Sequence, residues 1–127
     1  MERLGDLASR FATQERPVGN LLEEDAVAAQ AVAATRFFAG YAAIRSRAAV
    51  APPPPITVDT ELNDSEWAII RPLFILYLER ESALQLEASR GMGIDPYGRS
   101  SSEVAGEIAQ YEAELPRRAF CVPIITV

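Results

Sequence analysis

Apolar residues recur every three or four positions along four stretches of this chain, which is the spacing of amphipathic α-helices. The first stretch is residues 1–13, and Pro17 and Gly19 interrupt the pattern after it. The second begins at Asn20, a favourable N-cap residue, and continues to about residue 48. Residues 1–50 therefore predict an N-terminal helical hairpin. The many alanines of its second helix favour close packing against another helix, either within the chain or from an oligomer partner.

A third helix is predicted from Asn63 to about Arg90. Asn63 and Glu66 have the spacing of a capping box, and Gly91 is suited to the C-terminal end of the helix. Pro72 lies inside the segment and predicts a kink. The apolar stripe is dense enough to make this the core helix of the fold. The residues expected on its buried face are Trp67, Ile70, Phe74 and Tyr77.

A fourth helix is predicted to start at one of three consecutive serines, Ser100 to Ser102, and to end at Leu115 because Pro116 follows. Residues 63–115 thus predict a core helical hairpin. Residues 51–62 connect it to the N-terminal hairpin and contain the run Pro52–Pro55, which favours an extended polyproline II spacer or, alternatively, a ligand for a proline-binding domain. The pattern as a whole predicts one all-α domain over residues 1–127, a bundle of about four helices.

The final residues, 116–127, predict an extended C-terminal tail because they are rich in β-branched and aromatic residues. No other strand is predicted that such a tail could join within its own chain. Two interpretations stay open: the tail adds as a strand to a partner protein, or it folds back over its own helices. The candidate partner-binding residues are Arg117, Arg118, Phe120, Val122, Ile124, Ile125 and Val127.

Composition argues against catalysis. The chain has no His, and the single Cys121 excludes an internal disulfide and a cysteine-cluster metal site. Glu103 and Glu107 lie four residues apart and share a predicted helix face, which suits either a divalent cation of a hydrolase or, more simply, a solvated surface. We therefore expect no enzyme activity, no cofactor and no metal.

The net charge of −6 is unevenly distributed along the chain. Residues 1–50 have six Arg and six acidic residues, whereas residues 51–127 have six Arg and twelve acidic residues. An acidic second half argues against binding to nucleic acid phosphates, although it also serves solubility. The longest apolar stretch, Ala26–Ile44, is interrupted by Gln30 and Arg36, and no signal peptide is visible, so we predict no membrane association.

Four short stretches of the second half form a combination of motifs: Glu66–Pro72, Leu76–Glu81, Glu87–Arg90 and Tyr97–Ser100. Together they resemble the small helical head–tail connector proteins of tailed bacteriophages, also called adaptor or head-completion proteins. The resemblance covers Asn63–Val127, while the alanine-rich first half and the proline run depart from it.

The resemblance implies a structural virion protein. Its subunits would form a homo-oligomeric, dodecameric ring between the capsid portal and the tail, in contact with portal protein and with tail or collar proteins. The C-terminal tail would dock on the portal or on a neighbouring subunit, and DNA would pass through an acidic channel without specific binding. The alternative is a cytoplasmic helical adaptor or regulatory protein that binds one protein partner through the alanine-rich helix.

Overall fold

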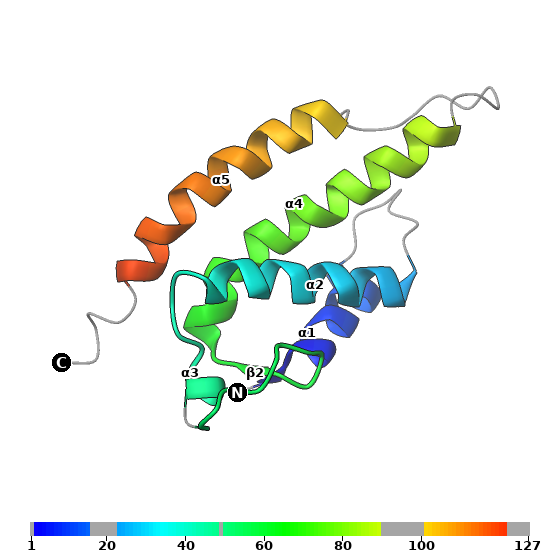
Figure 1. Ribbon diagram of the computed structural model, residues 1–127. Helices are drawn as coiled ribbons and strands as arrows, with labels where there is room; N and C mark the ends of the chain where they lie inside the picture. The colour runs from blue at the N-terminus through cyan, green and yellow to red at the C-terminus, as the bar shows by residue number, and fades with distance from the viewer. Residues whose placement is uncertain (1, 16–22, 49, 90–100, 122–127) are drawn as a thin grey trace.

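The computed structural model describes residues 2–15, 23–48, 50–89 and 101–121, and these residues form a predominantly helical bundle (Figure 1). The predicted all-α class is thereby confirmed. In chain order the elements are β1 (Glu2–Arg3), α1 (Leu4–Arg10), the π-helical turn η1 (Phe11–Glu15), α2 (Glu24–Ala39), α3 (Arg45–Ala48), β2 (Glu61–Leu62), α4 (Asp64–Ser89) and α5 (Ser101–Cys121).

The long helix α4 is the centre of the bundle. It packs against α2 and α5, and α1 in turn packs against α2 (Figure 1). The predicted capping box starts α4: Asn63 Oδ1 accepts from the Glu66 N–H at 2.8 Å, and Glu66 Oε1 accepts from the Asn63 N–H at 2.9 Å. The helix then continues as one element across Pro72.

The predicted core face of α4 is confirmed for the most part. Ile70 and Phe74 are fully buried and Tyr77 nearly so, whereas Trp67 is half-buried at the edge of the core. The Phe74 ring meets the Phe11 ring edge to face, with 5.1 Å between ring centroids. Side chains from α1, α2, α4 and α5 therefore share a single hydrophobic cluster.

Helix α2 is shorter than predicted. The sequence predicts a helix as far as residue 48, but α2 ends at Ala39 and a separate short helix, α3, begins at Arg45. After Gly40 the chain turns and places Ile44 in the core, where the side chain is 1% exposed. Burial of this side chain offsets the loss of helical hydrogen bonds across the turn. The predicted N-cap Asn20 lies outside the described residues.

The alanine-rich face of α2 is used inside the subunit. Ala31 and Ala34 are fully buried, and the same face buries Val27 and Phe38. The small side chains of the two alanines let α2 lie close to α1 and α4, with which α2 makes its main contacts.

The beginning of the chain pairs with the segment that precedes α4, which the sequence pattern did not predict. Strands β1 and β2 are antiparallel, with Glu2 opposite Leu62 and Arg3 opposite Glu61. The pairing continues where the Gly5 N–H donates to the Val58 carbonyl at 2.7 Å. A β-carbon at Gly5 would lie 3.2 Å from both the Cβ and the carbonyl oxygen of Val58, so this close approach favours glycine.

The predicted linker, residues 51–62, forms no helix over its described residues. Its proline run has neither helical nor strand structure, and the Ala51–Pro52 peptide bond is cis. The strand β2 lies at the end of this segment. Within the described part of the chain, no helix has the length and apolarity needed to span a membrane.

Helix α5 is longer than predicted, which corrects the boundary of the C-terminal tail. It passes through Pro116 and ends at Cys121, so residues 116–121 are helical and not extended. Proline costs the helix one hydrogen bond, but Leu115 before it is fully buried and the Arg118 guanidinium after it lies 5.3 Å from the centroid of the Tyr111 ring. The remainder of the predicted tail, residues 122–127, lies outside the described residues.

Candidate interaction surface

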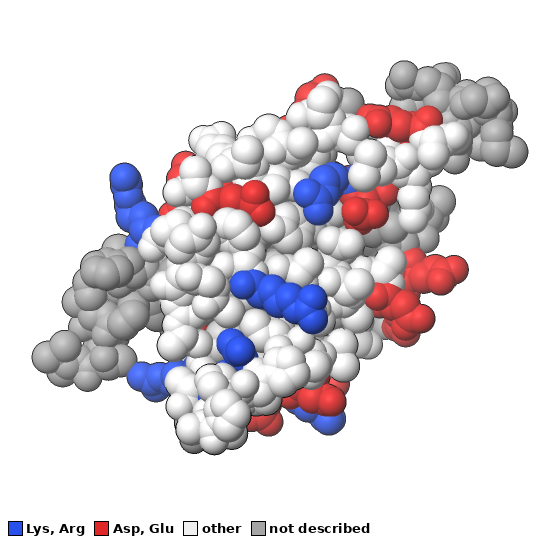
Figure 2. All heavy atoms as spheres, viewed as in Figure 1, with Lys and Arg blue, Asp and Glu red and all other residues white. Residues whose placement is uncertain are grey.

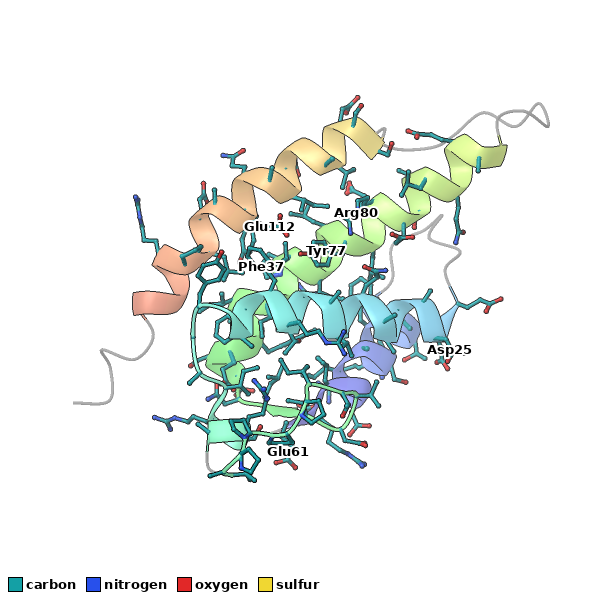
Figure 3. The ribbon with its side chains drawn as sticks, viewed as in Figure 1. Asp25, Phe37, Glu61, Tyr77, Arg80 and Glu112 are labelled. Atoms are coloured by element: carbon teal, nitrogen blue, oxygen red, sulfur yellow. The ribbon has the colours of Figure 1, made fainter. Side chains whose placement is uncertain are left out.

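Two tyrosine hydroxyls join α4 to α5. The Tyr111 hydroxyl donates to the Ile69 carbonyl at 2.6 Å, and the Tyr77 hydroxyl donates to Glu112 Oε2 at 2.6 Å. The guanidinium of Arg80 lies 4.9 Å from the centroid of the Tyr77 ring (Figure 3). These contacts fix α5 along α4 and determine which face of α5 remains outside.

Burial is the main cause of a raised pKa at Tyr77, and the hydrogen bond to Glu112 and the charge of that carboxylate raise the pKa further, while Arg80 opposes them. Burial also raises the pKa of Tyr111. Both hydroxyls therefore remain protonated donors at neutral pH, which makes them structural links and not proton-transfer groups.

A carboxylate of α4 caps the start of α5. Glu87 Oε1 accepts from the Ser101 N–H at 2.8 Å, and Glu87 Oε2 accepts from the Ser101 hydroxyl at 2.7 Å. The sequence predicted a serine cap, but the described acceptor for the helix N-terminus comes from the neighbouring helix. A cap supplied from another element has no local sequence signal, so the role of Glu87 was not predicted.

A buried carboxylate likewise joins α3 to α4. Glu66 is 3% exposed, and besides its own capping box it accepts from the Arg45 N–H through Oε2 at 3.0 Å. Both of its oxygens are thus used by backbone donors. This accounts for the burial of a charged group without any catalytic role.

The two predicted partner-binding arginines lie at the C-terminal end of α5. Arg117 and Arg118 are both exposed. The Arg118 guanidinium lies 5.3 Å from the centroid of the Tyr111 ring and 3.3 Å from Glu114 Oε2. In Figure 1 the last turn of α5 lies apart from the other labelled helices. The structure therefore presents these positive charges at an accessible helix end, where they also suit the helix dipole.

The other predicted tail residues divide into two groups. Phe120 belongs to the last turn of α5. The residues outside the described part of the chain are Val122, Ile124, Ile125 and Val127. The proposed contacts of this apolar segment consequently stay predictions.

The pair Glu103 and Glu107 is exposed on α5. Within residues 2–15, 23–48, 50–89 and 101–121, no cluster of three or more His, Cys, Asp or Glu side chains could hold a metal ion. Two carboxylates on one turn are too few for the oxygen cages that calcium prefers.

A shallow hollow lies between α3 and the proline run, and two of its polar side chains hold α3 to the linker. Arg47 Nε donates to the Pro54 carbonyl at 2.7 Å, and the Ser46 hydroxyl donates to the Glu61 carbonyl at 2.7 Å. These bonds attach the linker to the body of the bundle.

The exposed surface combines acidic clusters with scattered apolar side chains. Figure 2 shows acidic side chains over the beginning of α2, where Glu23, Glu24 and Asp25 are exposed. Near the other end of α2, Tyr41 is 54% exposed and its ring lies 5.3 Å from that of Phe37.

Comparison with known proteins gives no relative for this chain: no family model, no curated protein and no solved structure matches it.

Proposed function

We propose that this chain is a structural subunit of a tailed-bacteriophage virion, located in the connector between the capsid portal and the tail. The observation that carries the proposal is the C-terminal end of α5, which stands apart from the other helices and presents Arg117 and Arg118. The sequence beyond this end is apolar and rich in β-branched residues. An accessible helix end followed by such a segment suits docking by strand addition.

The internal contacts support a subunit that keeps its shape when it docks. The hydroxyls of Tyr77 and Tyr111 and the carboxylate of Glu87 fix α5 along α4. A rigid α4–α5 hairpin would hold the C-terminal segment in one position, which reduces the entropy lost on binding. In this proposal the α4–α5 hairpin would determine where residues 122–127 meet the portal.

The charge of α5 suits a ring around a DNA path. Four acidic residues precede its two arginines, and Glu103, Glu107 and Glu114 are exposed. Acidic side chains facing a channel would repel DNA phosphates, so DNA would pass without binding. The alternative role, an adaptor acting through the alanine-rich helix, is less favoured because Ala31 and Ala34 are already buried in the core.

The test is a truncation after Cys121, which removes residues 122–127 and leaves α5 complete. The full-length and truncated chains would be compared for binding to the portal protein encoded in the same genome, by pull-down and electron microscopy. We expect the full-length chain to form rings on the portal and the truncated chain to lose binding. Circular dichroism and the unfolding midpoint would be the same for both chains.

A substitution pair complements the truncation. Arg117→Glu together with Arg118→Glu would reverse the charge at the helix end while the apolar segment stays intact, and we expect weaker portal binding. The control is Arg36→Glu, an exposed arginine of α2. Portal binding that survived the removal of residues 122–127 would show that docking uses another surface.

A further inference from the structure

The proline run Pro52–Pro55 does not separate two bodies. Helices α1 and α2 before it and helices α4 and α5 after it contribute to one hydrophobic cluster. Ile56, which directly follows the run, is 6% exposed and belongs to the same cluster. The run therefore joins parts of the chain that are already in contact, and this position in the fold does not require a stiff spacer.

All four prolines of the run are exposed, and Val50 shortly before them is 51% exposed. Each proline ring fixes its own φ, and a proline also confines the residue before it to extended backbone. Consecutive prolines therefore form a polyproline II segment, which agrees with the lack of helix and strand at these positions. The chain thus displays a preformed apolar ligand on its surface.

The run is attached to the body of the bundle near its C-terminal end. Arg47 Nε donates to the Pro54 carbonyl at 2.7 Å, and the side chain of Ile56 is buried in the core. A segment held in this way has little conformational freedom left to lose. Its binding to a partner would therefore cost less entropy than the binding of a free peptide of the same sequence.

The backbone of the run keeps open hydrogen-bond acceptors. Within the described part of the chain, Arg47 uses the Pro54 carbonyl, but no donor is bonded to the carbonyls of Pro52, Pro53 and Pro55. Polyproline II has no internal hydrogen bonds, so these carbonyls face solvent. They suit the indole N–H of Trp and the hydroxyl of Tyr, whose rings also offer flat apolar faces to proline.

We propose that Pro52–Pro55 is the ligand of a partner protein whose binding groove is lined by aromatic side chains. The aromatic rings of the groove pack against the exposed proline rings, and Trp or Tyr donors of the groove bind the open carbonyls. This surface is separate from the C-terminal segment of the chain. The inference therefore does not rest on the proposed connector function.

The probe is an isolated domain with an aromatic-lined groove that binds poly-L-proline. The unlabelled full chain is titrated into the ¹⁵N-labelled domain and followed by NMR. We expect saturable shifts of the amides and indole N–H groups that line the groove. Added poly-L-proline should reverse these shifts, because it competes for the same groove.

A double substitution and a matched control test the run. Pro52→Ala together with Pro53→Ala removes two exposed rings and should weaken binding at least about tenfold, a loss of roughly 1.4 kcal/mol. The control is Val58→Ala, which removes another apolar side chain of the same linker, 42% exposed, and leaves every proline in place. Val58→Ala should bind as tightly as the wild-type chain, and circular dichroism verifies that both variants are folded.

A synthetic peptide of residues 50–56 tests whether the fold presents the run. The peptide has the same prolines without their attachment to α3 and the core, so the full chain should bind the domain at least as tightly. Binding by the peptide alone would overturn the proposal, as would a double variant that binds like the wild-type chain. A chain that does not bind the domain, and loses only stability in the double variant, would also overturn it, because the prolines would then serve only to stiffen the loop.

Discussion

The Tyr77 hydroxyl donates a 2.6 Å hydrogen bond to Glu112 Oε2, so a residue in the middle of α4 is joined directly to α5. The acceptor is a carboxylate and both groups are partly buried, which makes this bond stronger than an exposed contact between neutral groups. This bond leads to two predictions, and Glu66 and Pro116 each lead to one more.

Tyr77→Phe should lower the free energy of unfolding by about 1–3 kcal/mol. The hydrogen bond is lost, and the partly buried Oε2 of Glu112 loses the donor that Tyr77 provides. Guanidinium unfolding followed by circular dichroism measures the change. Tyr41→Phe is the matched control, since the Tyr41 side chain is 54% exposed and should lose little. Equal effects of the two substitutions would show that the Tyr77–Glu112 bond does not contribute to stability.

The stability of the wild-type chain should fall as the pH rises above about 10. The pKa of Tyr77 in the folded chain is raised above the ordinary value of 10.0 by burial and by Glu112. Below pH 10 both states hold the proton, and the stabilising contribution is complete. Above it the unfolded chain releases the proton while the folded chain retains it, so the free energy of unfolding decreases with pH.

Unfolding curves recorded at several pH values between about 8 and 11.5 test this dependence, because this range includes the ordinary tyrosine pKa. Tyr77→Phe should show a shallower decrease. Some decrease should persist in that variant, because burial also raises the pKa of Tyr111. A variant that loses stability as steeply as the wild-type chain would exclude Tyr77 as a source of the pH dependence.

Glu66→Gln should destabilise the junction of α3 and α4. The two carboxylate oxygens accept from the Asn63 and Arg45 N–H groups, and a glutamine can offer only one oxygen to these two donors. We expect a loss of about 1–3 kcal/mol in the free energy of unfolding. Glu61→Gln, at an exposed position of β2, is the control and should change stability by less than about 0.5 kcal/mol.

Pro116→Ala should stabilise the chain by about 1–3 kcal/mol, because alanine restores the N–H that a helix interior needs. The far-ultraviolet circular dichroism signal should hardly change, since α5 already continues to Cys121 in the native chain. Pro53→Ala, outside the helices, is the control. A large gain of helical signal in Pro116→Ala would instead mean that the native helix ends at Leu115.

The sequence predicted features that depend on neighbours along the chain. The capping box of Asn63 and Glu66 was predicted because its two residues lie three positions apart, which is the spacing of this motif at the start of a helix. The buried face of α4 was found because Ile70, Phe74 and Tyr77 follow the helical period. These signals need no knowledge of what packs against the helix.

Features that depend on distant partners were missed or misplaced. The end of α5 was placed at Leu115 from the local effect of Pro116, but the helix continues to Cys121. Glu87 caps a helix that begins fourteen residues later, and β1 pairs with a segment about sixty residues away. Arg117 and Arg118 were predicted in an extended tail and instead lie in α5.

The pairing of β1 with β2 has a consequence for the order of events during synthesis. Residues 2–5 leave the ribosome before the segment with which they pair, because the carbonyls of Val58 and Thr60 that accept from the Gly5 and Leu4 N–H groups are made more than fifty residues later. Closing so long a loop carries an entropic cost, so this contact should form late, after α2 and the linker have emerged. Residues 2–5 would thus reach their native positions late, after the start of α4 has formed, and their pairing would then join the N-terminal half to the segment before α4.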